Sequence, residues 1–159
     1  MKGNNGSGNN PSRDEWETPQ ELWNKLNEQY SFEFDCCASD NNTKCGHYSY
    51  KFERAIEKRE CSWMNPPFSK AYDMFKQFFK IIRKEVAIYR CDNFETKIWQ
   101  EEIFPYASWV FIPNKRIVYE GFEGKSARFP SALIGYNVDP PQELDGFTLI
   151  PEGQNKEVK

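Results

Sequence analysis

The sequence predicts an α/β protein with a mainly parallel sheet that ends in an antiparallel edge. Segments with strand and helix patterns alternate up to Phe104, and this order is typical of parallel sheets. Three strand-like segments follow without clear helices between them, which predicts the antiparallel edge. The chain has 159 residues, of which 38% are hydrophobic and 16% are aromatic. This composition is sufficient for one domain with a buried core.

A capping box predicts where the first helix begins. Thr18 and Glu21 have the required spacing, and Pro19 would take the first helical position. We therefore expect a helix over about 19–29. The apolar residues that recur on its inner face are Leu22, Leu26 and Tyr30.

The other elements follow from the spacing of their apolar residues. Alternating apolar residues or short apolar runs predict strands at 32–36, 48–52, 61–64, 86–89, 109–112, 116–119 and 132–136. Apolar residues three and four positions apart predict helices at about 70–84 and 96–104. The buried stripe expected for the helix at 70–84 consists of Tyr72, Phe75, Phe79 and Ile82.

The composition of the two ends predicts a single domain over residues 14–150. Residues 1–13 are rich in Gly, Asn and Ser, which is typical of a flexible tail. Residues 151–159 lack apolar periodicity and are expected to fray. The sequence contains no apolar run near the ~18 residues of a membrane span and no signal peptide, so we expect a cytoplasmic protein.

The cysteines favour reduced thiols over disulfides or zinc. There are five, an odd number, and no secretion signal accompanies them. Cys36, Cys37, Cys45 and His47 are close enough in sequence to suggest a zinc site. Their spacing lacks a paired CxxC or HxxxH, and adjacent cysteines on a strand point to opposite faces. We therefore expect no bound metal.

The charge distribution is uneven. The net charge is −3, whereas a dedicated DNA-binding module is usually basic. Two groups of basic residues nevertheless stand out, Lys70, Lys76, Lys80, Arg83, Lys84 and Arg90 in the first, and Lys115, Arg116, Lys125 and Arg128 in the second. Each group is either a solvated face or part of a basic rim that contacts phosphates transiently.

The most informative stretch is Asn65-Pro66-Pro67-Phe68, which follows the strand at 61–64. Consecutive prolines force extended backbone and offer carbonyls without competing N–H groups. The Asn65 side-chain oxygen and the Pro66 carbonyl could both accept from one –NH2 group, while Phe68 stacks on the attached ring. Accepting both protons takes the nitrogen lone pair out of conjugation, as methylation of adenine N6 requires. The alternative is a proline-rich turn with Phe68 in the core.

Two predicted strands end in residues suited to ligand contact. Ligands bind beyond the carboxyl ends of the strands in a parallel sheet. Asp35, followed by the small residues Ala38 and Ser39, ends one strand, and Asn65 follows another. If these strands are neighbours, their ends would join a cofactor pocket to a substrate pocket.

Four elements occur in a fixed order along the chain. They are Trp16-x-Thr18-Pro19, Phe34-Asp35-x-x-Ala38-Ser39, Asn65-Pro66-Pro67-Phe68 and Arg128-Phe129-Pro130-Ser131-Ala132-Leu133. In this order, over about residues 14–136, the chain resembles the phage-type DNA N6-adenine methyltransferases, the Dam-like family of phage and prophage. The resemblance implies a Rossmann-like class I methyltransferase fold, reduced in size, that uses S-adenosylmethionine.

The resemblance also implies roles for individual residues. Thr18 and Pro19 would hold the methionine part of the cofactor, and Asp35 and Ala38 would belong to the cofactor loop. The residues that match the target-base pocket are Asn65, Pro66 and Phe68. The chain departs from larger methyltransferases because it lacks a Gly-x-Gly loop after the first strand. It also lacks a clear acid for the cofactor ribose, for which Glu53 is the candidate and a surface charge the alternative.

The expected reaction is methyl transfer from S-adenosylmethionine to the N6 amine of adenine in DNA, after base flipping. Phosphate contacts are expected from Lys70, Lys76, Arg116, Lys125 and Arg128. Phe94, Thr96 and Trp99 lie where this family often approaches the target base, but their helical spacing indicates core. We expect a monomer or weak homodimer, in the host cytoplasm if the protein is phage-encoded. Two alternatives remain open: methylation of an RNA base or a glutamine amide, and a non-catalytic nucleic-acid-binding protein on a decayed methyltransferase scaffold.

Overall fold

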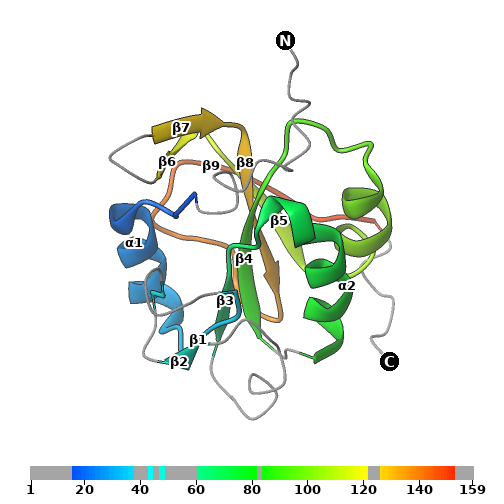
Figure 1. The fold of residues 1–159 in the computed structure, drawn as a ribbon, viewed down its shortest axis with the longest axis horizontal. Coiled ribbons are helices and arrows are strands. Elements are labelled where there is room, and N and C mark those ends of the chain that lie inside the picture. Colours follow the sequence, from blue (N-terminus) through cyan, green and yellow to red (C-terminus); the bar gives the residue numbers. More distant parts are fainter. Residues whose placement is uncertain are drawn as a thin grey trace.

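The computed structural model describes residues 16–37, 43–44, 47–48, 61–81, 84–121 and 126–152. These residues form a seven-stranded sheet with helices on both faces and a separate two-stranded hairpin (Figure 1). The strand order in the sheet is β2-β1-β3-β4-β8-β5-β9. The α/β class predicted from the sequence is therefore confirmed.

The first half of the sheet is parallel. It consists of β2 (His47–Tyr48), β1 (Phe34–Asp35), β3 (Ser62–Met64) and β4 (Glu85–Arg90). The three ladders that join these strands all run parallel. As a result, the carboxyl ends of β1, β3 and β4 meet at one edge of the sheet, where the sequence predicts ligand binding.

The second half of the sheet is antiparallel and extends further than the predicted edge. It consists of β8 (Ser131–Tyr136), β5 (Trp109–Pro113) and β9 (Gly146–Leu149). Strand β8 lies between β4 and β5 and runs antiparallel to both, and β9 runs antiparallel to β5. The chain leaves β5 through the hairpin of β6 (Ile117–Glu120) and β7 (Ser126–Phe129). Because no crossover helix intervenes, β8 returns antiparallel, and the sheet is mixed rather than mainly parallel.

Two apolar cores lie on opposite faces of the sheet. Helix α2 (Ala71–Ile81) and the short π-helix η4 (Ile98–Ile103) cover one face, and α1 (Gln20–Tyr30) covers the other (Figure 1). Strand β4 shows the division, because Ala87 belongs to the core under α2 while Val86 and Ile88 belong to the core under α1. The helical residues buried in these cores include Trp23, Leu26 and Tyr30 of α1 and Phe75, Phe78 and Phe79 of α2.

The first helix is confirmed, but the capping box is wrong. Pro19 is the N-cap residue, with φ −58° and ψ 137°, and no side chain caps the first turn. Thr18 therefore lies one position before the N-cap and cannot play the predicted part. Its hydroxyl instead accepts a hydrogen bond from the Asn65 side chain at 3.2 Å.

Where the structure describes them, the remaining predicted elements agree in type and differ in extent. Residues 49–52 of the expected strand at 48–52 and Ile82 of the expected helix at 70–84 lie outside the described residues. Only Phe34–Asp35 of the expected strand at 32–36 is paired. Helix α2 is preceded by a 3₁₀ turn, η3 (Phe68–Lys70), and the predicted helix at 96–104 contains the shorter π-helix η4. Strands β7 and β9 are absent from the prediction. In β9 Phe147 and Leu149 alternate with Thr148, but all four residues of the strand are exposed.

In the part of the chain that the structure describes, no helix is long and apolar enough to span a membrane.

Candidate active site

Three strand ends converge at the carboxyl edge of the parallel half-sheet. Asp35 is the last residue of β1, Asn65 directly follows β3, and Arg90 is the last residue of β4. Strand β3 lies between β1 and β4, and the Cys36 N–H donates to the Trp63 carbonyl at 2.9 Å just beyond β1. The two strand ends expected to meet, those of Asp35 and Asn65, are therefore on neighbouring strands.

The Asn65 side chain is held by residues at the start of the described chain. Its amide nitrogen Nδ2 donates to the Trp16 carbonyl at 3.1 Å and to the Thr18 hydroxyl at 3.2 Å. A backbone carbonyl can only accept, so the –NH2 group of Asn65 must face Trp16. Both amide protons are then engaged. Among the described residues, no donor reaches the Asn65 Oδ1 atom, and this oxygen remains available to a substrate amine.

The two prolines present one free carbonyl beside Asn65. The Pro67 carbonyl accepts from the Lys70 N–H at 3.0 Å and so begins the 3₁₀ turn. For the buried Pro66, the described residues provide no donor to the carbonyl. Asn65 and Pro66 can therefore each offer an unused oxygen, as the motif requires.

Phe68 belongs to an aromatic wall at the same edge. Its ring packs edge-on against the rings of Phe129 and Tyr89. The distance between ring centroids is 5.4 Å to Phe129 and 6.2 Å to Tyr89. The Arg90 guanidinium carbon lies 5.2 Å from the centre of the Phe68 ring and 5.3 Å from that of Phe129. Asp92 fixes this guanidinium through two hydrogen bonds, from Nε at 2.9 Å and from Nη2 at 2.6 Å. Phe68 is half-buried, so it is neither a core residue nor freely exposed.

A cavity of about 300 Å³ opens beside this wall. Its lining residues are Phe68, Tyr89, Arg90, Asp92, Asn93, Thr96 and Trp99. The volume is at the lower end of those of small-molecule sites, which run from about 300 to 1,000 Å³. The prediction that Phe94, Thr96 and Trp99 are core holds for Trp99, which is buried and donates from its indole to the Arg90 carbonyl at 3.1 Å. Phe94 is partly buried against the same core. The prediction is wrong for Thr96, which precedes η4 and is exposed.

Asp35 is buried at the end of β1 and shapes the loop that follows. Its Oδ2 accepts from the Lys44 N–H at 3.0 Å, and its Oδ1 accepts from the Cys37 N–H at 3.4 Å. Burial raises the pKa of Asp35 to about 6, although the hydrogen bonds and the charge of Lys44 oppose this shift. The carboxylate thus organises backbone rather than facing solvent.

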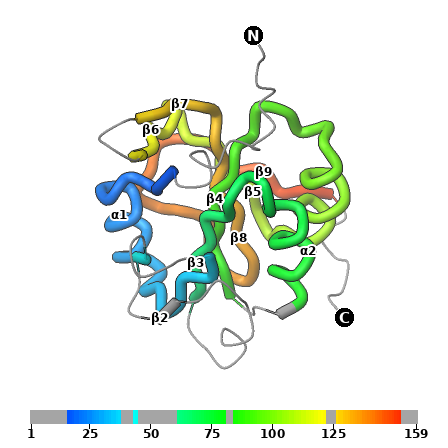
Figure 2. The backbone as a smooth tube through the Cα atoms, in the orientation of Figure 1, coloured from blue at the N-terminus to red at the C-terminus, as the bar shows by residue number. Residues whose placement is uncertain are grey.

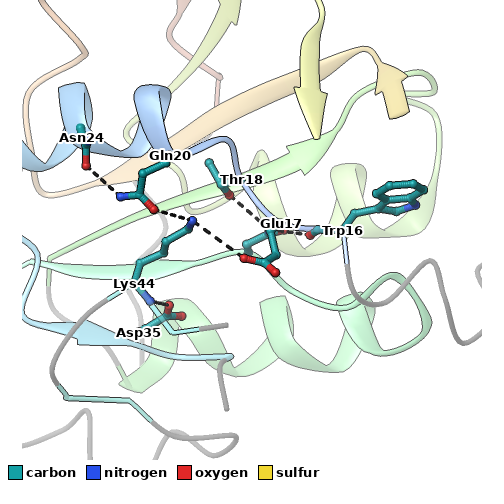
Figure 3. Close-up of polar contacts among 8 residues, drawn as sticks. Trp16, Glu17, Thr18, Gln20, Asn24, Asp35 and Lys44 are labelled. Carbon is teal, nitrogen blue, oxygen red and sulfur yellow. Dashed lines mark hydrogen bonds and ion pairs between the residues drawn. The ribbon is translucent and has the colours of Figure 1, made fainter. Parts of the chain in front are cut away.

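Lys44 connects this loop to helix α1. Its side chain is only 9% exposed, and its Nζ donates to the Gln20 Oε1 at 2.9 Å and lies 4.0 Å from the Glu17 Oε1 (Figure 3). The half-buried Pro19 stands directly before Gln20, and the buried Thr18 before that. Lys44 and the residues at the start of α1, Glu17 and Gln20, therefore form one polar cluster.

Four of the five predicted phosphate contacts are described, and all four are exposed. Lys70 ends η3 beside Phe68, Lys76 lies on α2, and Arg116 and Arg128 belong to or adjoin the β6–β7 hairpin. Lys125 lies outside the described residues, as do Ala38 and Glu53. Cys45 and the His47 side chain are also outside them, and the described residues contain no cluster of His, Cys, Asp and Glu that could hold a metal.

A model of the family described as DNA N-6-adenine-methyltransferase (Dam) matches residues 6–125. The chain belongs to this family. It is therefore an adenine-specific DNA methyltransferase, which methylates the N6 position of adenine with S-adenosylmethionine. A comparison with curated proteins finds no match. The match to the Dam family includes three of the four elements of the predicted resemblance and ends before the fourth, which begins at Arg128.

Several residues near the site escaped prediction as site residues, among them Lys44, Arg90 and Asp92. Lys44 lies in a loop without periodicity, and nothing in its sequence context distinguishes it from a surface lysine. Arg90 is part of a predicted basic group, but its position over Phe68 depends on the neighbouring strands. Asp92 could have been predicted from its position, because it is a charged residue directly beyond a strand end. Ligands bind beyond the carboxyl ends of the strands in parallel sheets.

Proposed function

We propose that this edge of the sheet is the active site of a class I methyltransferase fold, with the cofactor beside β1 and the target adenine beside Asn65 and Phe68. The observation that carries the proposal is the state of the Asn65 amide. Its nitrogen is bonded to Trp16 and Thr18, so its oxygen is left for the substrate.

The residues around β1 and α1 suit S-adenosylmethionine, whose methionine part carries a carboxylate and an ammonium group. The first turn of α1 has no side-chain cap, so its N–H groups are available to a carboxylate. The Lys44 ammonium adds positive charge at the same turn, and the Glu17 carboxylate could accept from the ligand's ammonium.

Thr18 and Pro19 adjoin this turn, and Asp35 holds the loop after β1 in place. Ala38 and Glu53 keep their predicted roles in the cofactor loop and at the ribose. The cofactor supplies a methyl group activated on a sulfonium, so the residues of the chain have to align the reactants and exclude water.

The chain's main chemical task is to prepare the adenine amine. The Asn65 Oδ1 and the Pro66 carbonyl each accept one N6 proton and hold both N–H bonds on one side of the nitrogen. The nitrogen lone pair then leaves conjugation with the ring and points toward the methyl donor. After transfer, the surplus N6 proton passes to solvent. Neither residue needs to act as a formal base.

The target adenine must leave the DNA duplex to reach these groups. Stacking on Phe68 offsets part of that cost, at roughly 1–3 kcal/mol per base. The cavity beside Phe68 offers room for the flipped base. Arg90 already lies over the Phe68 ring and can stack on a base as it does on an aromatic side chain.

The exposed basic residues would hold the DNA around this site. Lys70 adjoins Phe68, and Arg116 and Arg128 place positive charge on the β6–β7 hairpin. Lys76 and Lys125 complete the proposed set. We propose that the single domain over residues 14–150 acts as a monomer or weak homodimer. A DNA substrate agrees with the cytoplasmic location that the sequence predicts.

The experiment that tests this function is a methyl-transfer assay with radiolabelled cofactor on DNA, RNA and protein offered separately. We expect label in DNA alone, and loss of that label in Asn65→Ala. A parallel measurement of S-adenosylhomocysteine binding checks that the variant still folds and binds cofactor. Label in RNA or on a glutamine, with DNA unlabelled, would refute the assignment. Binding of DNA without any transfer would favour the non-catalytic alternative.

A further inference from the structure

Three residues at the start of the described chain, Trp16 to Thr18, connect the β6–β7 hairpin to Asn65. We call these three residues the strap. Glu17 and Glu120 of β6 exchange two backbone hydrogen bonds, from the Glu17 N–H at 2.7 Å and from the Glu120 N–H at 3.0 Å. Figure 2 shows the start of the described chain beside this hairpin. The strap is thus attached to the hairpin as a third, very short strand.

The Trp16 side chain strengthens this attachment. Its ring lies directly on Gly121, so that a Cβ atom at that position would overlap the ring at its Cζ3 atom. Only glycine leaves space for the ring in this position. The strap is therefore fixed on the hairpin by backbone pairing at Glu17 and by side-chain packing at Trp16.

The other side of the strap holds the Asn65 amide. The Trp16 carbonyl and the Thr18 hydroxyl both accept from Nδ2, at 3.1 and 3.2 Å, and Thr18 is 1% exposed. If the amide turned over, Oδ1 would face the Trp16 carbonyl, and two acceptors would meet without a proton between them. The strap thus distinguishes the oxygen of Asn65 from its nitrogen.

We propose that the strap is a positioning element of the active site, which orients the Asn65 oxygen toward the target amine. Through the strap, the orientation of the Asn65 amide depends on the position of the β6–β7 hairpin. The inference rests on the proposed role of Asn65 in catalysis. Trp16 and Thr18 are positioning residues, since they act through Asn65. The hairpin carries the exposed Arg128, which is a proposed phosphate contact. A movement of the hairpin when it binds DNA would therefore be transmitted to the Asn65 amide by the three residues of the strap.

The first test compares Thr18→Val with Thr18→Ser at saturating DNA and cofactor. Valine keeps the shape of threonine but removes the acceptor, whereas serine keeps the hydroxyl. We expect Thr18→Val to slow a single turnover by roughly 5- to 100-fold, because the part-buried Asn65 amide loses one of its two acceptors. Thr18→Ser should recover most of the rate. The rate at saturating cofactor is the readout, because Thr18 also adjoins the proposed cofactor site and the affinity of either variant for S-adenosylhomocysteine can change.

A Thr18→Val variant with the wild-type rate would overturn the proposal. So would a variant whose cofactor affinity falls while its rate at saturation is unchanged, because Thr18 would then serve the cofactor alone. The wild-type enzyme provides the reference for the proposed function. If it fails to methylate adenine, that function is wrong, whereas an active wild type with an unaffected Thr18→Val contradicts the strap alone.

The second test is the pH profile of Asn65→Asp, which does not depend on Thr18. An aspartate at position 65 can bond to the Trp16 carbonyl only when it is protonated, and its second oxygen then faces the amine as in the wild type. We expect activity that rises as the pH falls from about 8.5 to about 5.5, relative to the wild-type profile over the same range. Activity of Asn65→Asp that parallels the wild-type profile at every pH would contradict a role for the Trp16 carbonyl.

Discussion

Glu85 offers a sharp test of the core at the end of β4 opposite the active site. It is the first residue of β4 and is completely buried, and among the described residues neither of its carboxyl oxygens finds a hydrogen-bond partner. Ser62 lies opposite it on β3, and the described residues offer its hydroxyl no partner either. Burial raises the pKa of Glu85 well above its ordinary value of 4.5. The carboxyl is therefore protonated in the folded protein under conditions where it ionises in the unfolded chain.

The sign of the pH dependence follows from proton binding. Above pH 4.5 the folded state holds a proton that the unfolded state has lost, so the contribution of Glu85 to stability declines as the pH rises toward its folded-state pKa. The slope is about 1.4 kcal/mol per pH unit. For a chain of 159 residues, this amounts to roughly 3–6 °C in the melting temperature per pH unit.

Glu85→Gln isolates this effect, because glutamine has the same shape and does not titrate. Both proteins can be melted thermally at values from about pH 5 to about pH 7. The melting temperature of the variant should rise relative to that of the wild type as the pH increases. The difference between the two curves removes the contribution of other titrating groups, such as Asp35. Parallel curves over this range would refute the conclusion that Glu85 is buried without a partner.

Three further predictions concern the site itself. Phe68→Ala should lower the methylation rate by about 5- to 150-fold, and Phe68→Tyr should retain most of it, since stacking needs an aromatic face; equal rates in the two variants would contradict stacking. Affinity for S-adenosylhomocysteine should fall as the pH drops through about 6, because the pKa of Asp35 is raised to about 6 and its protonation weakens the loop after β1. Calorimetry should find this dependence absent in Asp35→Asn. Arg128→Gln should flatten the log–log salt dependence of DNA binding by about one unit if Arg128 contacts a phosphate, as titrations at several salt concentrations would reveal.

The periodic elements of the fold could be predicted from the sequence because their cores impose a pattern. Phe75 and Phe79 recur at the spacing of a buried helix, and both are buried in α2. Strands β3 and β4 appear as short apolar runs because both of their faces are covered. In strand β9, Phe147 and Leu149 alternate with Thr148, but the strand is exposed, so no core imposes a longer pattern on its sequence.

The mixed character of the sheet depends on information that a local pattern does not contain. Strands β5 and β8 both look like ordinary buried strands in the sequence. Their order in the sheet, with β8 between β4 and β5, follows from how the β6–β7 hairpin returns the chain. The absence of a helix after Phe104 predicts antiparallel strands but not their depth within the sheet.

The candidate site also contains residues that a local pattern predicts and residues that only the fold brings together. Asn65 and Phe68 could be predicted because their chemistry is visible in four consecutive residues. The partners of Asn65 could not, because Trp16 and Thr18 are 49 and 47 residues away. Thr18 shows how a local pattern misleads: its spacing from Glu21 fits a capping box, whereas its hydroxyl is used by a residue brought near by the fold.

The role of the Asn65 oxygen in preparing the adenine amine for methyl transfer can be tested by mass spectrometry of nucleosides. The nucleosides come from plasmid DNA treated with the wild-type protein and with Asn65→Ala. We predict N6-methyladenine in the DNA treated with wild type. Asn65→Ala should reduce its rate of formation by about 10²- to 10³-fold while S-adenosylhomocysteine binding is preserved. Equal rates of N6-methyladenine formation by the two proteins, or a methyl group on cytosine with adenine unmodified, would contradict this role.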